Sequence, residues 1–246
     1  MIPLRDANPV RRRPVVTIAI IAICVVVFAY ELVIQSSAGD AALGRLFRAY
    51  GLVPGELTGA FNGDQANRLH AELLGVVTGM FLHGGWIHLI GNLLYLWIFG
   101  NNIEDRLGRL GFLVFYLFGG LAAAATQIAI DPRSDVPIIG ASGAIAAVLG
   151  AYLVLYPRAR VLSLVFLGFF YQLLHVPAVI VLGLWFALQL VDGVASLGPQ
   201  SSTGGVALFE HIGGFVAGAA VALVIRAAGR AGGSRPAPSA GRIGVG

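Results

Sequence analysis

Long stretches without a charged residue decide the structural class of this chain. Residues 161–191 contain no Asp, Glu, Lys or Arg, and residues 110–130 form a second stretch of this kind. Both reach the roughly 20 residues that an α-helix needs to cross the hydrocarbon core of a bilayer. Of the 246 residues, 57% are hydrophobic and 11% are charged, against about 25% charged in an ordinary soluble domain. The sequence therefore excludes a soluble globule and predicts a helical membrane protein.

Charge and cysteine content exclude further classes. Every basic residue is Arg, and the net charge is +4. Arginines of a membrane protein orient the chain in the bilayer, and the sequence holds no compact patch of basic and aromatic residues, so we expect no nucleic-acid partner. The single cysteine, Cys24, lies within an apolar run. One thiol excludes both an intrachain disulfide and a thiol cluster for a metal.

Six apolar segments, separated by charged or proline-containing turns, are predicted to span the membrane. The first is longer than the core of a signal peptide, so we expect an uncleaved anchor. The run 161–191 is too long for one upright helix, and Pro177 divides it into an interfacial or strand-like connection at 161–175 and a span. A long external loop is expected at about 35–85. The expected spans are 15–34, 86–99 (or 103), 110–130, 138–156, 176–191 and 206–225.

The distribution of arginines predicts the orientation of these spans. Twelve of the 16 lie in the amino-terminal segment, in the turns near 104–109 and 157–160 and in the residues that follow the sixth span, and four lie in the opposite loops. Both termini are therefore expected in the cytoplasm. We divide the chain into a cytoplasmic segment (1–14), a six-helix domain (15–227) and a disordered cytoplasmic tail (228–246). The expected protein is an all-α, multi-pass bundle in the plasma (inner) membrane.

Polar residues inside three of the predicted spans point to one site. The second, fourth and sixth spans all begin on the external side, and each carries a polar side chain within its first turns. Ionisable residues in a membrane span are costly and usually face a bundle interior or a water-filled cavity. The residues concerned are His88 and Asn92, Ser142, and His211.

The spacing of small residues predicts which spans pack together. Small residues allow close approach of helix backbones in lipid, and each of two spans has a stripe of them on the face that carries its polar residue. If the stripes meet, Ser142 and His211 come within hydrogen-bond reach, which is the arrangement of a nucleophile and a general base in acyl transfer. The stripes are Ser142, Ala146 and Gly150 on the fourth span, and His211, Gly214 and Gly218 on the sixth.

The second span supplies donors for an oxyanion. His88 and Asn92 are four residues apart and share one helix face. Ser142 stands at the start of its helix, where backbone N–H groups are free to donate. Glu210 precedes His211 and points about 100° away around the helix, so it is a poor orienting group and we expect a dyad.

These residues have other interpretations. A serine in a membrane helix is commonly a packing residue, and the hydrolase motif G-x-S-x-G is broken by Ala144. A metal site of His83, His88 and His211 lacks a carboxylate set or H-E-x-x-H spacing, so no metal is expected. A proton relay is a further role for a membrane histidine, and a transporter would show broken helices and inverted repeats, which we do not find. His70, His83 and His175 are interpreted as loop or structural residues.

Four motifs together resemble the rhomboid family of intramembrane serine proteases. Residues 81–92, FLHGGWIHLIGN, are similar to the H-x-x-x-N region of the second helix in that family. The resemblance extends over about 45–226. The other motifs are the E-x-R-L-G turn at Glu104, Arg106, Leu107 and Gly108, the nucleophile motif Gly140-Ala141-Ser142-Gly143, and the base motif His211-Ile212-Gly213-Gly214 with Gly218.

The resemblance implies a cofactor-independent endopeptidase that cleaves transmembrane proteins near the external face of the lipid bilayer. It makes Ser142 the nucleophile and His211 the general base, with His88, Asn92 and the Ser142 N–H at the oxyanion. It also makes the fifth span, with Trp185, Phe186 and Gln189, and the loop 192–207 a lateral gate and cap. The alternative is a catalytically inactive relative that binds transmembrane clients.

Two departures from the family pattern stand out. The position four residues after the nucleophile, often an aromatic residue that stacks on the base, is Ala146 in this chain. The Trp-Arg pair that some members carry in the first external loop is absent near Leu74 and Gly75. Both the orientation of His211 and the anchoring of the loop therefore need another source.

Overall fold

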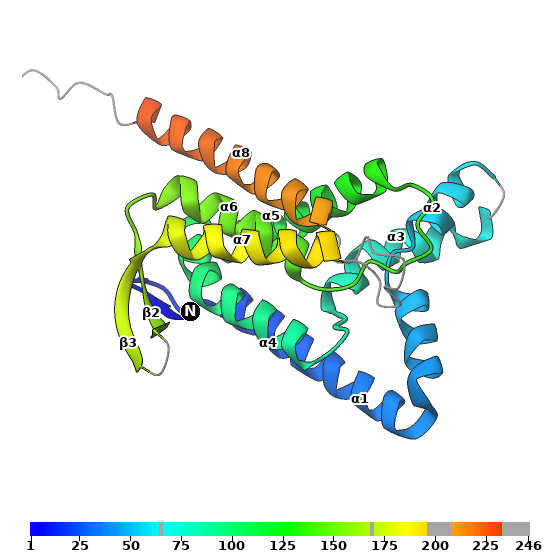
Figure 1. The fold of residues 1–246 in the computed structure, drawn as a ribbon. Helices are drawn as coiled ribbons and strands as arrows, with labels where there is room; N and C mark the ends of the chain where they lie inside the picture. Colours follow the sequence, from blue (N-terminus) through cyan, green and yellow to red (C-terminus); the bar gives the residue numbers. More distant parts are fainter. Residues whose placement is uncertain (64–65, 168–169, 196–207, 233–246) are drawn as a thin grey trace, which may run out of the picture.

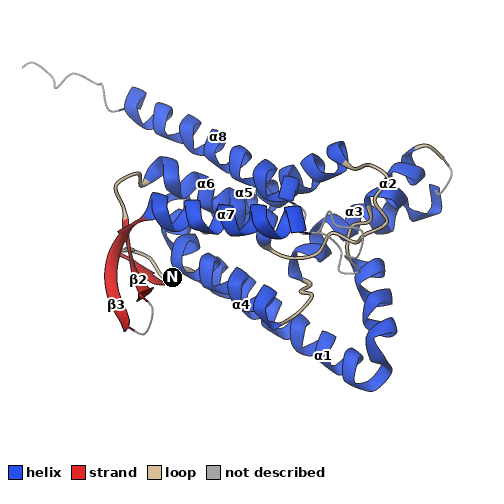
Figure 2. Ribbon diagram, in the orientation of Figure 1, coloured by secondary structure: helices blue, strands red, loops and turns tan. Residues whose placement is uncertain are grey.

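Helices make up most of the chain, and a small sheet lies at one end of the helical bundle (Figure 1). The computed structural model describes residues 1–63, 66–167, 170–195 and 208–232. Figure 2 shows the helices and the three strands in the same orientation. The longer helices are α1 (Val15–Tyr50), α2 (Pro54–Phe61), α3 (Leu69–Thr78), α4 (Trp86–Tyr95), α5 (Asn101–Ile130), α6 (Ser142–Leu155), α7 (Ala178–Ala195) and α8 (Leu208–Gly232).

Short helical segments connect several of these elements. Two 3₁₀ segments, η1 (Ala66–Arg68) and η2 (Gly79–Phe81), lie on either side of α3. A π-helical segment, η3 (Leu96–Gly100), joins α4 directly to α5. The strands are β1 (Ile2–Asp6), β2 (Arg160–Leu167) and β3 (Phe170–Pro177).

Apolar helices occupy the positions of all the predicted spans. In the described part of the chain, three helical stretches are long and apolar enough to cross a membrane: Val15–Tyr50, Trp86–Ile130 and Leu208–Ala228. Ser142–Leu155 and Ala178–Leu188 are shorter apolar helices. The stretch Trp86–Ile130 is broken at Gly108, whose φ of +74° separates the second predicted span from the third. The six crossings and the cytoplasmic location of both termini stay predictions.

The predicted external loop is mostly helical. α1 continues past a break at Gly39 (φ +77°) as far as Tyr50, and α2 and α3 follow. Two buried carboxylates hold this region together: Glu56 forms ion pairs with Arg48 and Arg68, and Glu72 pairs with Arg68 at 3.0 Å. This ion-pair network anchors the loop of a chain that lacks the Trp-Arg pair.

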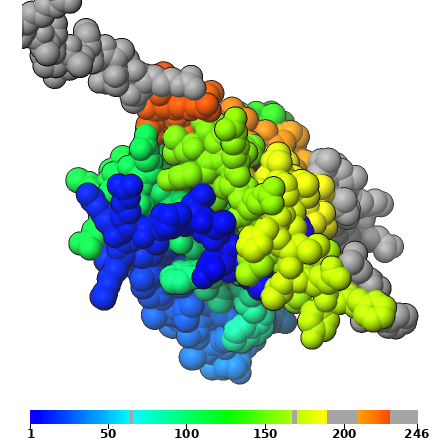
Figure 3. All heavy atoms as spheres, turned by 90° about the vertical axis from the view of Figure 1, so that its left-hand side faces the viewer, coloured from blue at the N-terminus to red at the C-terminus, as the bar shows by residue number. Residues whose placement is uncertain are grey.

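A three-stranded antiparallel sheet, in the order β1-β2-β3, corrects the all-α prediction. The strand-like connection predicted at 161–175 is confirmed as the hairpin of β2 and β3, in which Phe166 pairs with Tyr171. β1 was not predicted, because a five-residue strand has no periodicity of its own and its partner is more than 150 residues away. Figure 3 shows the amino-terminal segment against this end of the molecule.

Hydrogen bonds fix the amino-terminal segment to the helices. Asp6 Oδ2 accepts hydrogen bonds from Asn102 Nδ2 (2.8 Å) and Tyr152 OH (3.0 Å), and Asn8 Nδ2 donates to Tyr152 OH (2.7 Å). Burial raises the pKa of Asp6 above its ordinary value. These bonds link the amino-terminal segment to α5 and α6. The disordered tail was predicted to begin at 228, whereas α8 extends to Gly232. Residues 233–246 lie outside the described residues.

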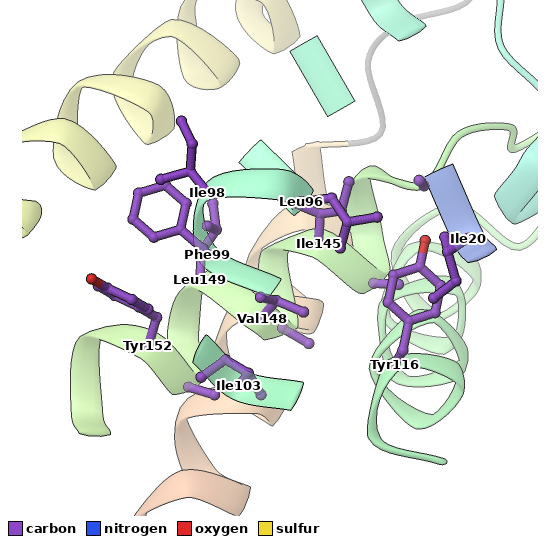
Figure 4. Close-up of a cluster of buried hydrophobic side chains, with 14 of the residues drawn as sticks. Ile20, Leu96, Ile98, Phe99, Ile103, Tyr116, Ile145, Val148, Leu149 and Tyr152 are labelled. Carbon is purple, nitrogen blue, oxygen red and sulfur yellow. The ribbon is translucent and has the colours of Figure 1, made fainter. Parts of the chain in front are cut away.

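α6 lies at the centre of the bundle. Every residue from Ser142 to Tyr152 is buried, as expected for a helix that is apolar all round. Its large side chains pack with residues of α1, η3 and α5 in the core shown in Figure 4. The labelled members of this core are Ile20, Leu96, Ile98, Phe99, Ile103, Tyr116, Ile145, Val148, Leu149 and Tyr152.

Candidate active site

Ser142 is the first residue of the central helix. It is buried, with 6% of its surface exposed. The turn before it depends on Gly140, whose φ is +117° and whose N–H donates to the Gly79 carbonyl oxygen at 2.8 Å. The first N–H groups of a helix have no partner within it. Ser142 therefore combines a hydroxyl with free amide donors at the positive end of a helix.

α6 and α8 pack backbone against backbone beside this serine. A Cβ at Gly214 would collide with the Gly143 carbonyl oxygen, and a Cβ at Gly218 would collide with that of Ala147. In the other direction, a Cβ at Gly150 would collide with the Phe215 carbonyl oxygen. Only glycines permit such a close approach at these three positions.

His211 lies one turn before the Gly143–Gly214 contact on α8. It is buried, with 2% of its surface exposed. Since Ser142 immediately precedes Gly143, one of the backbone contacts of the two helices lies close to both predicted site residues. The neighbouring Glu210 is also buried, and its Oε1 would lie 2.5 Å from a Cβ at Gly143. The carboxylate thus faces the start of α6.

His88 on α4 faces the same turn. Its Nε2 would lie 2.7 Å from a Cβ at Gly140, and Ser142 Oγ would lie 3.6 Å from that point. The Gly84 N–H donates to His88 Nδ1 at 3.4 Å. In a neutral imidazole that accepts at Nδ1, the proton is on Nε2. The nitrogen that faces the turn before Ser142 is therefore the donor.

Asn92 follows one turn after His88 on the same helix. It is buried, with 7% of its surface exposed. Among the described residues, no group forms a hydrogen bond with its Nδ2. An amide donor without a protein partner is rare in a protein interior. The Asn92 amide is thus able to donate a hydrogen bond to a bound molecule.

Glu31 and His83, which have no predicted chemical role, support α4. The carboxylate of Glu31 on α1 is 1% exposed and accepts from the His83 N–H at 3.1 Å. The His83 ring lies 5.2 Å from the His88 ring between centroids. Burial is the main cause that lowers the pKa of His83 to about 4, and nearby His88 adds to the effect. A glutamate in an apolar span was the one available indication of this support.

An aromatic residue from α7 lies against the imidazole of His211. The Trp185 ring centroid is 5.5 Å from that of His211, with an angle of 55° between the planes. Trp185 also contacts Tyr95 on α4, with 5.8 Å between the two ring centroids. Residue 146 on α6 is Ala, so this position supplies no aromatic ring to His211. Trp185 on α7 supplies the ring contact.

The remaining candidate residues from the sequence are His70, His175, Gln189 and those of the predicted cap. His70 lies on α3 and His175 on β3, both at exposed positions. In the part of the chain described, no three His, Cys, Asp or Glu residues are arranged to hold a metal ion. The side chain of Gln189 and most of the predicted cap (196–207) lie outside the described residues.

Comparisons with known proteins agree with the motifs. The family model of the Rhomboid domain matches residues 70–228. The rhomboid protease GluP of Bacillus subtilis is 34% identical over 163 residues, which are 65% of this chain and 29% of that protein. Rhomboid-like protein 11, chloroplastic, of Arabidopsis thaliana is 42% identical over 69 residues, 28% of this chain and 24% of the relative.

A mitochondrial relative matches over an intermediate length. Rhomboid protein 1, mitochondrial, of Saccharomyces cerevisiae is 31% identical over 97 residues, which are 38% of this chain and 28% of the relative. In each of these three comparisons the chain covers less than a third of the relative. The matches thus concern a shared domain.

Proposed function

This chain belongs to the rhomboid family and is a multi-pass membrane protein, and we propose that it is an intramembrane serine endopeptidase with Ser142 and His211 as its catalytic dyad. The observation that supports this most is the backbone contact of α6 and α8 at Gly143 and Gly214. A hydroxyl and an imidazole next to such a contact are the two groups that acyl transfer requires.

The proposed reaction has two halves. His211 accepts the hydroxyl proton of Ser142 while Oγ attacks the carbonyl carbon of the scissile peptide bond. His211 then gives this proton to the leaving amine as the C–N bond breaks, which leaves an acyl-enzyme. Water, deprotonated by His211, attacks the ester, and the proton returns to Ser142 Oγ as the carboxylic acid product leaves. No metal or cofactor takes part in this scheme.

Negative charge on the former carbonyl oxygen needs donors. We assign them to His88 Nε2–H, Asn92 Nδ2–H and the Ser142 backbone N–H. The tautomer of His88 and the unpartnered buried amide of Asn92 support this assignment. Loss of one such donor typically lowers kcat by about 10²–10³-fold.

The proposed substrates are transmembrane segments of other proteins. A transmembrane helix holds its carbonyl groups in internal hydrogen bonds, so the segment has to unwind before a serine can attack. Helix-weakening residues near the scissile bond are therefore expected. The family resemblance adds small residues at the cleaved bond and cleavage near the external face. We also propose a place in the plasma (inner) membrane, which membrane fractionation tests.

Covalent labelling tests the dyad directly. Purified protein in detergent is incubated with a fluorophosphonate probe, and the labelled residue is identified by peptide mapping. We expect labelling at Ser142 in the wild type and none in Ser142→Ala or His211→Ala. A transmembrane substrate with Gly or Pro near its external end should be cleaved by the wild type alone.

The same experiment decides between the enzyme and the inactive relative. A protein that binds transmembrane clients without cleaving them would capture the substrate and leave both substrate and probe unchanged. Labelling at a residue other than Ser142, or equal cleavage by Ser142→Ala, would contradict the proposed dyad.

A further inference from the structure

We propose that Trp185 is a positioning residue that holds the imidazole of the general base His211. This inference rests on the proposed function and adds a residue that acts through the base. Trp185 belongs to α7, whereas the two members of the dyad belong to α6 and α8. The ring contact therefore links a third helix to the site.

The indole of Trp185 is held on more than one side. Its ring centroid lies 5.5 Å from that of His211 on α8 and 5.8 Å from that of Tyr95 on α4. Tyr95 in turn stacks on Phe99, with 5.9 Å between the ring centroids, and Phe99 is fully buried in the core. Trp185 is half-buried, and contacts with rings on two other helices reduce the rotamers available to it, so it can restrict the ring of its neighbour.

α6 cannot supply such a ring. The position one turn after Ser142 is Ala146, which is 0% exposed and would lie 3.3 Å from a Cβ at Gly214. Its methyl group packs on the backbone of α8 and offers no aromatic surface to His211. Among the described residues, Trp185 brings an aromatic ring into contact with this imidazole.

An aromatic ring favours both states that a general base has to adopt. The base carries a positive charge after it accepts the serine proton, and a cation within about 6 Å of an indole centroid is attracted by its π-electrons. The same ring limits rotation of the neutral imidazole before attack. Misplacement of a reacting group by about 1 Å can reduce a rate by about 10²-fold, so the geometric effect alone is measurable.

The substitutions that test this role separate the ring from its bulk. Trp185→Phe keeps an aromatic ring, and Trp185→Leu keeps apolar volume without one. Trp97→Leu makes the same chemical change at a side chain that is 50% exposed on η3. Leu182→Ala loosens the packing of α7 at a residue that is 3% exposed. All are measured as full-length protein in detergent.

Two constants of the fluorophosphonate reaction are measured for each variant: kinact, the maximal rate of labelling at Ser142, and KI, the probe concentration at half that rate. Trp185→Leu should lower kinact about 10- to 100-fold with KI unchanged, because the base acts in the chemical step. Trp185→Phe should stay within about 3-fold of the wild type, since it retains the ring. Leu182→Ala should lower the thermal unfolding midpoint without changing kinact, and Trp97→Leu should leave both unchanged.

The outcomes distinguish the two levels of the proposal. Absence of labelling at Ser142 in the wild type defeats the proposed function. Labelling of the wild type together with an unchanged kinact in Trp185→Leu overturns the role of Trp185 and leaves the dyad intact. Equal losses of kinact in Trp185→Leu and Leu182→Ala, or in Trp185→Leu and Trp185→Phe, would assign the effect to packing and also overturn it.

Discussion

Glu104 on α5 caps the start of α1 by accepting hydrogen bonds from both the amide (2.8 Å) and the hydroxyl (2.8 Å) of Thr17. The second carboxylate oxygen accepts from the Val16 N–H at 2.9 Å. The residue before α1 is Pro14, which has no side chain able to cap the helix. One buried carboxylate thus accepts from the free N–H groups at the start of a helix 87 residues away.

Removal of this cap should destabilise the protein. Glu104→Ala leaves two amide N–H groups and a hydroxyl without an acceptor, each buried or half-buried, at a cost of about 1–3 kcal/mol. We expect a lower thermal unfolding midpoint in detergent. Asp105→Asn is the control, because its carboxylate accepts a hydrogen bond from an exposed donor, the Arg12 N–H. An unchanged midpoint in Glu104→Ala would contradict the capping role.

A methyl group at the contact of α6 and α8 should separate these helices. In Gly218→Ala the new Cβ would meet the carbonyl oxygen of Ala147, which belongs to the backbone and can yield only if the helices move. Overpacking of this kind costs about 1–3 kcal/mol. We expect lower thermal stability and slower labelling of Ser142.

Gly183→Ala is the matched control for that change. Gly183 is also a helical glycine, on α7, and a Cβ there has no atom within 4 Å. Alanine is the better helix former by about 1 kcal/mol, so this variant should be as stable as the wild type or more stable. Equal losses in both variants would show that the helix contact is unimportant.

The turn before Ser142 depends on a glycine for two separate reasons. Gly140 has a φ of +117°, and a Cβ there would lie 2.7 Å from His88 Nε2. Gly140→Ala should therefore displace His88 and slow both labelling and cleavage. Gly63→Ala introduces the strain alone, since Gly63 has a φ of +90° and open space around its Cβ position. Similar activity of the two variants would argue against a contact with His88.

Asp6 should make the stability of the protein depend on pH. Burial raises its pKa in the folded state above the ordinary 3.8, so the folded protein binds the proton more tightly than the unfolded chain does. The corresponding stability is fully present below pH about 4 and is lost as the pH rises through the folded-state pKa.

Asp6→Asn removes this dependence, because an amide stays neutral and its oxygen can accept the same hydrogen bonds. The difference between the unfolding midpoints of Asp6→Asn and the wild type should grow as the pH rises from 4 toward 8. The two proteins are measured in one detergent at constant ionic strength. Parallel curves over this range would show that Asp6 does not titrate within the folded state.

Helix positions could be predicted from sequence because they depend on local composition. Charge-free runs predicted the spans, Gly108 marked a turn between two of them, and the apolar hairpin of β2 and β3 was anticipated as a strand-like segment. The glycines of α6 and α8 could be assigned to helix faces from their spacing. The family assignment followed from four short motifs and is confirmed by the matched Rhomboid domain.

Contacts between distant segments could not be predicted from the sequence. β1 pairs with a strand more than 150 residues away, and its five residues show no periodicity that distinguishes a strand. The family resemblance placed Trp185 in a lateral gate, but its contact with His211 could not be predicted, because that contact depends on how α7 packs on α8. Glu31 and Glu104 were visible as charges, but the amides that they satisfy were not.

The pairing of β1 with β2 also sets an order of assembly during synthesis. The amino-terminal strand leaves the ribosome first, yet it has no partner until β2, beginning at Arg160, has been made. Asp6 likewise waits for Asn102 and Tyr152. The first few residues therefore stay unpaired while the helices that precede Arg160 are synthesised, and the sheet closes late in biogenesis.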